Sequence, residues 1–361
     1  MTPARQAIAS RWPAPSAEGA PGSGLAILVN ANAKRGGRRV AVQIARTLPG
    51  AGVRLTKATQ EIDAWLRMLP PPRAVLAAGG DGTAVALLNA LARVTPDGER
   101  LPTVGVLPLG TGNGWAHALG APKLHMCLDL LGRTWGRLPT RRCSLVEVEG
   151  TLAHFAGSGW DAMILNDYKH QLETSRVPLR RFSKSVYGYV SAALLRTAPK
   201  VAAFGNPRVV VENLGAEAYS LGEGGALQPI AGDPRGRVLY EGPAGVASVG
   251  TCPEFGYRFR AFPFAERMPG FINVRVYNRG ALGAVQSIPM LWRGAHPLRG
   301  MHDWFATHVR MTFSRPVALQ IGGDAHGMRQ SIEYRAASRG AQLLDWRRLL
   351  CLNSEASADD R

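Results

Sequence analysis

The stretch AVLAAGGDGTAVALLNALAR, residues 74–93, decides the fold of the first part of this chain. It starts with a continuous apolar run, residues 74–78, which is typical of a buried strand in a parallel sheet. Residues 84–93 lack Gly and Pro and are rich in helix formers, so they predict a helix. The turn between them, Gly79-Gly80-Asp81-Gly82-Thr83, places backbone N–H groups and glycines at a helix N-terminus, an arrangement that suits an anion such as phosphate.

Asp81 is the unusual residue of this turn. A carboxylate beside phosphate groups repels them unless a divalent cation lies between the two. The sequence therefore predicts Mg²⁺-dependent phosphate chemistry, with Asp81 as the metal-binding residue and as a catalytic residue.

Two further glycine-rich turns follow apolar runs. Residues 103–107 predict a strand that leads into PLGTGNG, residues 108–114, and a short helix over 115–119. Residues 25–29 predict a strand that leads into NANAKRGG, residues 30–37, and a helix over 38–48. A single glycine turn often binds nothing, but three strand-turn-helix units in order favour a doubly wound sheet. Its ligand is expected along the carboxyl ends of the strands.

The composition fits a globular protein of about two domains, with 361 residues of which 46% are hydrophobic. No run approaches the ~18 apolar residues of a membrane span. Residues 1–24 are rich in Ala, Pro, Gly and Ser and predict a disordered tail without the apolar block of a signal peptide. The cysteines show no metal-ligand spacing and are expected to be reduced thiols of a cytoplasmic protein: Cys127, Cys143, Cys252 and Cys351.

The net charge of +17 is the strongest deviation in composition, with basic clusters at 34–39 and 176–184. Two interpretations explain this charge equally well: an excess of solvated arginines without a function, or a binding role. Among binding roles it favours phosphate-bearing ligands, anionic lipid surfaces or nucleic acid. We see no zinc-finger spacing and no aromatic RNA-binding motif, so nucleic acid is the weakest of these. We expect peripheral association with the anionic inner face of a membrane.

The texture of the sequence changes after residue 140. Short β-rich runs separated by turn signals predict a largely antiparallel domain over 141–334, after an α/β domain over 25–140. Strands are expected at 209–211, 238–240, 272–277, 309–313, 317–321 and 331–334. A helix is expected over 185–196 and a long loop over 213–236. The C-terminal segment, 335–361, is expected to form a helix from residue 342 that packs back on the first domain.

Gly-Gly-Asp-Gly-Thr at 79–83 with Pro-x-Gly-Thr-x-Asn at 108–113 resembles the diacylglycerol kinase catalytic family, which includes sphingosine and ceramide kinases and bacterial lipid kinases. Asn30 with Gly36 or Gly37 stands where that family has Asn-Pro-x-Ser-Gly, although Ala31 replaces the proline. Residues 157–162 match the family's Gly-x-Gly-x-Asp-Ala, and residues 255–274 follow its β-domain pattern.

The resemblance implies a phosphofructokinase- or NAD kinase-like α/β domain, a β-sandwich lipid-binding domain, and ATP bound with Mg²⁺ in the cleft between them. The implied activity is transfer of the γ-phosphate to a hydroxyl of diacylglycerol, a sphingoid base or ceramide. The residues implied to bind the nucleotide are Asn30, Gly79, Gly80, Gly82, Thr83, Gly110, Thr111, Gly112, Asn113, Arg180, Arg181 and Lys184. Gly159 and Asp161 are implied to line the lipid pocket. For Arg180, Arg181 and Lys184, a solvated basic helix start is an equally good interpretation.

Two positions depart from the family. Gly114 and Trp115 follow Asn113 where many members have Asp-Phe, so one acidic residue is missing; sphingosine-kinase-like members lack it too. The Asp-Gly-Glu element, whose glutamate is the proposed general base of several members, is best matched by residues 322–327, where Asp324 is kept and His326 replaces the glutamate. A free imidazole accepts a proton at neutral pH but supplies no negative charge to a metal. His326 is thus a general base, a hydrogen-bonding bystander or a mark of lost catalysis.

Three interpretations compete with a lipid kinase. NAD kinases share the Gly-Gly-Asp-Gly-Thr turn, but their Asn-x-Gly-x-Leu-Gly-Phe motif is absent from this sequence. A nucleotide-dependent lipid sensor with a degraded active site is indicated by His326 and Gly114. A nucleic-acid-binding role rests on net charge alone. A homodimer is compatible with the sequence, which carries no motif that decides the oligomeric state.

Overall fold

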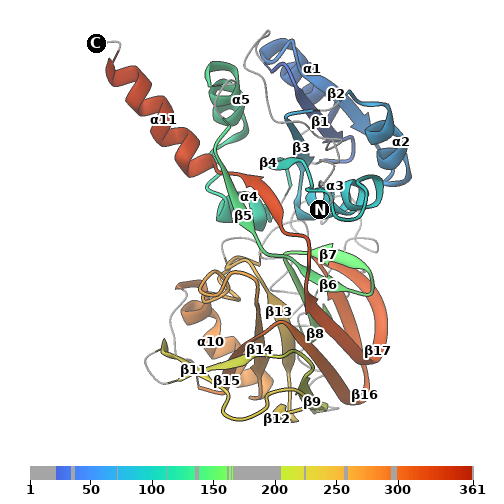
Figure 1. The fold of residues 1–361 in the computed structure, drawn as a ribbon, viewed down its shortest axis with the longest axis vertical. Helices are drawn as coiled ribbons and strands as arrows, with labels where there is room; N and C mark the ends of the chain where they lie inside the picture. Colours follow the sequence, from blue (N-terminus) through green and yellow to red (C-terminus); the bar gives the residue numbers. More distant parts are fainter. Residues whose placement is uncertain are drawn as a thin grey trace, which may run out of the picture. The chain divides into compact units, whose positions relative to one another are not determined.

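The computed structural model in Figure 1 describes residues 22–33, 37–70, 72–110, 112–134, 138–160, 162–163, 165, 205–222, 225–255, 259–293 and 299–359. Their contacts divide the chain into two compact units. Unit 1 comprises the described residues of Met1–Gly110, Leu119–Arg142 and Arg339–Arg361, and unit 2 those of Thr111–Ala118 and Cys143–Ser338. The expected α/β and β-rich domains differ from these units mainly at Thr111–Ala118, which groups with unit 2.

Unit 1 is built on a six-stranded sheet whose strand order is β2-β1-β3-β4-β18-β5. The strands are β1 (Leu25–Asn30), β2 (Gly52–Thr56), β3 (Ala74–Gly79), β4 (Thr103–Pro108), β5 (Thr140–Cys143) and β18 (Ala341–Leu344). The pairs β1–β2, β1–β3, β3–β4 and β4–β18 are parallel. The continuous apolar runs of β1 and β3 are buried along nearly their whole length, as expected of inner strands of a parallel sheet.

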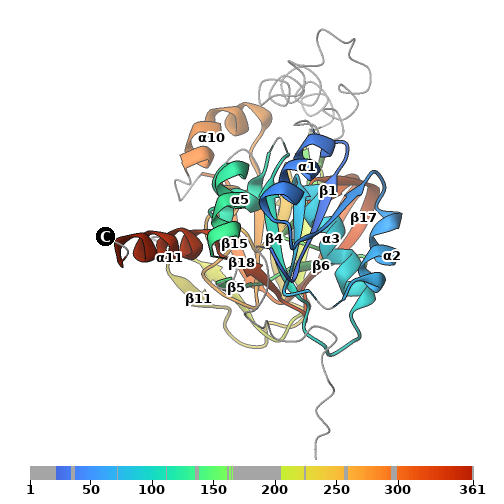
Figure 2. The ribbon, with the colours of Figure 1, turned by 90° about the horizontal axis from the view of Figure 1, so that it is seen from above.

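The helices of unit 1 lie between its strands in the sequence or after the last of them. They are α1 (Gly37–Thr47), α2 (Gln60–Met68), α3 (Asp81–Val94), α5 (Leu124–Arg133) and α11 (Trp346–Asp359). Figure 2 shows α1 and α5 together on one side of the sheet and α2 and α3 on the other. The predicted faces are the buried ones, since Val40 and Ile44 of α1 are buried. The prediction of an α/β unit with a parallel sheet is confirmed.

The C-terminal prediction was wrong in one respect. Residues 341–344 form strand β18 beside β4 instead of the first turn of a helix, and α11 begins only at Trp346. The reason is tertiary: pairing with β4 satisfies backbone groups at that edge and buries Leu343 and Leu344. Trp346 is also buried in unit 1, where its Nε1 donates to the carbonyl of Val106 at 3.2 Å.

Unit 2 is a twelve-stranded sheet in which the strand pairs are antiparallel, so the prediction of a large antiparallel region is confirmed. The strands are β6 (Val146–Val148), β7 (Thr151–Ala153), β8 (Phe155–Gly159), β9 (Arg208–Asn213), β10 (Ala218–Leu221), β11 (Leu227–Pro229), β12 (Val238–Pro243), β13 (Val246–Gly250), β14 (Ile272–Tyr277), β15 (Met301–Ala306), β16 (His308–Ile321) and β17 (Asp324–Ala336). Alternate residues of β14, such as Val274 and Val276, belong to one buried apolar cluster.

Unit 2 corrects several smaller expectations. The runs 309–313 and 317–321 belong to one strand, β16, whose register with β17 shifts between Thr312 and Val317. The expected loop 213–236 contains β10 and β11. Helix α10 (Ala281–Arg293) was not expected, because its largely apolar sequence has no clear period and contains Pro289. The expected helix 185–196 lies outside the described residues. No helix among the described residues is long and apolar enough to cross a membrane.

Candidate functional site

The three glycine-rich turns meet at one edge of the sheet in unit 1. Strands β1, β3 and β4 are neighbours and run parallel, so their carboxyl ends lie side by side. Asn30 ends β1, Gly79 ends β3 and Pro108 ends β4. This edge is where open α/β sheets bind their ligands.

Hydrogen bonds join the turns directly. The backbone N–H groups of Leu109 and Gly110 both donate to the carbonyl oxygen of Gly79, each at 3.0 Å. The side-chain amide of Asn30 donates to the hydroxyl of Thr83 at 3.0 Å. The second turn is thus bonded to the first through a side chain and to the third through the backbone.

The glycines of these turns are required by space. An added Cβ at Gly80 would lie 3.3 Å from the Cα of Gly110, and one at Gly79 would collide with the side chain of Thr83. Gly80 itself has φ −95°, which other residues adopt readily, so its missing side chain matters only because the turns approach closely. Gly37 repeats this pattern, since a Cβ there would collide with the carbonyl oxygen of Asn30.

Helix α3 presents its N-terminus at this edge. Gly80 is its N-cap residue and offers no capping side chain, while its carbonyl accepts hydrogen bonds from the N–H groups of Thr83 (3.0 Å) and Ala84 (3.2 Å). The first N–H groups of a helix have no acceptor within the helix, and the aligned peptide dipoles favour negative charge there. The helix runs for 14 residues. Its N-terminus, bordered by two other glycine turns, can hold an anion.

Asp81 is the first residue of α3 and is partly exposed. Among the residues that the structure describes, no group of three or more His, Cys, Asp or Glu side chains could hold a metal ion. Mg²⁺ commonly takes one or two protein carboxylates and completes its coordination with substrate phosphates and water. The donors present therefore fit a Mg²⁺ ion that binds together with phosphate groups.

The end of β2 also borders the site, which the sequence analysis missed. The N–H of Ala31 donates to the carbonyl of Thr56 at 2.8 Å, and the Nδ2 of Asn32 lies 3.5 Å from the carbonyl oxygen of Lys57. Lys57 is exposed and adds a cation at this edge. The only signal in the sequence is the short run GVRLT, in which alternate residues are polar or small, so β2 was not recognised.

The second half of the third turn belongs to unit 2. Asn113 adopts the left-handed conformation (φ 48°), is mostly buried, and its carbonyl accepts a hydrogen bond from the N–H of His117 at 2.9 Å. Gly112 precedes it and is partly exposed. Helix α4 (Gly114–Ala118) follows at once. Thr111 lies outside the described residues.

Gly159, expected in the lipid pocket, ends β8 with φ 96°. A Cβ there would collide with the carbonyl oxygen of Gly245, which accepts a hydrogen bond from the N–H of Trp160 at 2.8 Å. Glycine is therefore needed here for both conformation and space. The other residues expected in unit 2 lie outside the described residues: Asp161, Arg180, Arg181 and Lys184.

Asp324 and His326 lie on β17, directly after the Gly322-Gly323 turn that follows β16. Asp324 is opposite Ile321 in the hairpin and is exposed, while His326 is partly buried. Hydrogen bonds from Arg329 hold the pKa of Glu149 below its usual range, and the charge of His326 contributes in the same direction. His326 therefore lies within electrostatic reach of a carboxylate of unit 2.

Comparison with known proteins finds a family resemblance in the segment that carries the glycine-rich turns. Residues 24–135 match the family described as "Diacylglycerol kinase catalytic domain". This part of the chain is similar to that family, as the glycine motifs predicted.

Two curated relatives share short segments with the chain. The eye-specific diacylglycerol kinase of Drosophila melanogaster is 54% identical over 50 residues, which are 14% of this chain and 3% of that protein. The diacylglycerol kinase of Bacillus subtilis (strain 168) is 47% identical over 49 residues, 14% of this chain and 15% of that protein. The matched segments thus span only a small part of either relative.

Solved structures resemble the chain over most of its length. A putative diacylglycerol kinase from Bacillus anthracis str. Sterne has a TM-score of 0.61 at 15% sequence identity, and the likeness covers 90% of this chain and 98% of that one. A diacylglycerol kinase structure from the same organism has a TM-score of 0.56 at 14% identity, with 89% and 96% covered. At this identity the likeness is one of fold.

Proposed function

We propose that this protein is an ATP- and Mg²⁺-dependent lipid kinase that transfers the γ-phosphate to a hydroxyl of diacylglycerol, a sphingoid base or ceramide. The observation that carries the proposal is the bonded set of glycine turns: Asn30 to Thr83, and Leu109 and Gly110 to Gly79. These turns lie within residues 24–135, the segment that matches the diacylglycerol kinase catalytic domain.

In this proposal unit 1 is the phosphofructokinase- or NAD kinase-like nucleotide domain. The ATP phosphates bind at the N-terminus of α3 and at the third turn, which approach each other closely at Gly80 and Gly110. Asn30 and Thr83 fix the shape of the site. Asp81 holds the Mg²⁺ ion, which when bound offsets the negative charge of the phosphates. Arg180, Arg181 and Lys184 would add cations to the nucleotide phosphates.

The acceptor hydroxyl must lose a proton during transfer, and Asp81, Asp324 and His326 are the candidate bases. A partly buried imidazole suits this task near neutral pH. His326 lies close enough to Glu149 to interact with its carboxylate. The same proximity is compatible with a bystander that only supports the β6–β7 turn.

Unit 2 supplies the lipid side of the reaction in this proposal, as a β-sandwich with Gly159 and Asp161 in its pocket. The protein meets its substrate at the inner face of a membrane as a peripheral cytoplasmic protein. The net charge of +17 supports attraction to anionic lipids. The proposal includes a homodimer as the oligomeric state that the sequence permits.

The test is transfer of labelled phosphate from γ-labelled ATP, with Mg²⁺, to an extract of membrane lipids and to a panel of pure lipids. The proposal expects label in the organic phase and a phosphorylated lipid identified by mass spectrometry. NAD is offered as a separate acceptor in the same assay, and label in NAD instead of in a lipid would assign the protein to the NAD kinases. ATP binding without any transfer would overturn the kinase proposal.

The second candidate is a nucleotide-dependent lipid sensor whose active site has degraded. His326 in place of the family's glutamate and Gly114 in place of an acidic residue favour it. The sensor predicts that ATP changes lipid binding while no phosphate is transferred to any lipid of the panel.

A further inference from the structure

His154 is a buried titratable residue to which the proposed reaction gives no role. It lies between β7 and β8, is 1% exposed, and burial lowers its pKa to about 3, so the ring is neutral. Neither ring nitrogen has a hydrogen-bond partner among the described residues. A buried imidazole without hydrogen bonds loses solvation energy, so its position needs another explanation.

The ring of His154 lies between two aromatic side chains. It stacks on Trp115 with ring centroids 4.6 Å apart and an angle of 11° between the planes, and its edge contacts Phe155 at 4.4 Å and 78°. Its backbone carbonyl accepts hydrogen bonds from the N–H (2.9 Å) and the hydroxyl (3.2 Å) of Thr251. The aromatic contacts thus hold the plane of the imidazole, and the hydrogen bonds from Thr251 hold the backbone that carries it.

Trp115 is the second residue of α4, the helix that follows the third glycine turn. The helix has only 5 residues, too few to be stable without packing. Trp115 is 2% exposed, and Ala116 and Ala118 are also buried. All of these residues belong to unit 2, and the stack on His154 is one of the contacts that hold α4 in place.

The end of the third turn continues directly into this helix. The carbonyl of Asn113 accepts a hydrogen bond from the N–H of His117, in the helix that Trp115 anchors. Asn113 also holds a left-handed conformation that is strained for a residue with a side chain. Loss of the anchor would release this strain and change the path of the turn.

We propose that His154 is the positioning residue of the third glycine turn, acting through Trp115 to fix Gly112 and Asn113 in the shape that binds the phosphate donor. The inference rests on the proposed function for what the turn binds. The claim that His154 holds α4 in place rests on the stacking of His154 on Trp115 and not on the proposed function.

The anchor is tested without nucleotide, by hydrogen exchange of the backbone amides of residues 112–119 in the full-length protein. His154→Ala is expected to speed exchange at His117 about tenfold, the size of a typical aromatic pair contribution. His154→Phe keeps a flat ring and is expected to stay within about threefold of wild type. Met311→Ala is the matched control, since Met311 is equally buried in unit 2 but lies on β16.

The positioning role is tested by kinetics with MgATP and a lipid that the wild-type protein phosphorylates. His154→Ala is expected to raise the KM for ATP about tenfold while the KM for the lipid is unchanged, and His154→Phe is expected to restore it. Unchanged exchange at residues 112–119, or an equal loss in Met311→Ala, would overturn the anchor. Faster exchange with an unchanged KM for ATP would overturn the positioning role. A wild-type protein without transfer activity would overturn the proposed function instead, and the exchange data would still decide the anchor.

Discussion

Asn30 and Thr83 are 53 positions apart in the sequence, yet the amide of one donates to the hydroxyl of the other. Each residue was predicted separately, because each follows an apolar run and belongs to a polar or glycine-rich turn. The bond between them could not be predicted, since it depends on β1 and β3 being neighbours in the sheet. The site is therefore a product of strand order as much as of motif.

At the same scale, we expect Asp81→Asn to abolish phosphate transfer and leave the fold intact. The carboxylate is the only acidic group in the second turn, and loss of such a group commonly costs about 10²–10⁴-fold in rate. Turnover and thermal unfolding are measured together. A variant of normal stability with more than half of the wild-type turnover would remove Asp81 from the mechanism.

His326 makes a second prediction at the residue scale. If it is the general base, activity falls on acidification, because a protonated imidazole accepts no further proton. His326→Ala is expected to lower kcat about 10²-fold and His326→Glu to restore part of it. Near-normal kinetics of His326→Ala would move the role of base to Asp81 or Asp324.

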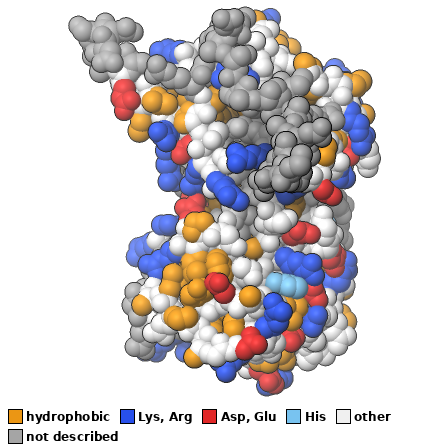
Figure 3. Space-filling view, in the orientation of Figure 1, with side chains coloured by type: hydrophobic (Ala, Val, Ile, Leu, Met, Phe, Trp, Pro, Cys, Tyr) orange, Lys and Arg blue, Asp and Glu red, His pale blue; other side chains and the backbone are white. Residues whose placement is uncertain are grey.

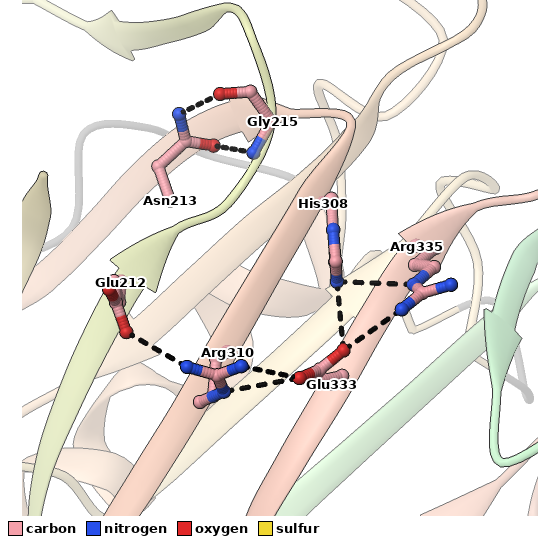
Figure 4. A network of polar contacts seen from close by, with 7 residues as sticks. All are labelled: Glu212, Asn213, Gly215, His308, Arg310, Glu333 and Arg335. Carbon is pink, nitrogen blue, oxygen red and sulfur yellow. Dashed lines mark hydrogen bonds and ion pairs between the residues drawn. The ribbon is translucent and has the colours of Figure 1, made fainter. Parts of the chain in front are cut away.

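At the scale of elements, the outer face of β16 and β17 carries a polar network, shown in Figure 4. Glu333 accepts hydrogen bonds from Arg310 (2.7 Å) and Arg335 (3.1 Å), and its other contact is the Nε2 of His308 at 3.1 Å. These partners, Arg310 first, lower the pKa of Glu333 to about 2. The network joins strands whose register shifts along the hairpin, and it stabilises their pairing.

The network predicts a pH-dependent contribution to stability. Because the pKa of Glu333 is lower in the folded protein than its ordinary 4.5, its contribution is complete above about 4.5 and is lost as the pH falls toward about 2. Glu333→Gln should lower the Tm at pH 7, and the difference from wild type should shrink over that range. Glu355→Gln, at an exposed site on α11, is the control. A Tm difference that stays constant from pH 7 to pH 2 would contradict the assignment.

Elements with a clear pattern were predictable and elements made by tertiary pairing were not. The runs of β1, β3 and β4 are continuous and apolar, so strand and turn could be read directly. Strand β18 was taken for the start of a helix, because Gln342 to Leu350 has helical spacing and nothing local shows that β4 needs a neighbour. Helix α10 was missed because Pro289 and its even apolar composition hide the period.

For the whole molecule, charge is the property most open to test. Lys and Arg side chains are spread over the face in Figure 3 rather than gathered in one patch. The net charge is +17. Each basic residue near an anionic leaflet contributes about 1 kcal/mol to the free energy of membrane binding, and 1 M salt shortens the range of this attraction to about 3 Å. Sedimentation with vesicles should therefore need anionic lipid and weaken in high salt. Equal binding to zwitterionic vesicles in low and high salt would contradict an electrostatic interaction.

The central claim is that the three glycine turns together bind the phosphates of ATP, and equilibrium titration of MgATP tests it most directly. Gly80→Ala needs no change of backbone conformation, but places a methyl group about 3.3 Å from the Cα of Gly110, where the second and third turns approach. Gly280→Ala is the control, because a Cβ there meets no atom within 4 Å. We predict that the wild-type protein and Gly280→Ala bind MgATP equally, and that Gly80→Ala binds at least about tenfold more weakly, ~1.4 kcal/mol. Wild-type affinity in Gly80→Ala, or no binding of MgATP by the wild-type protein, would contradict the claim.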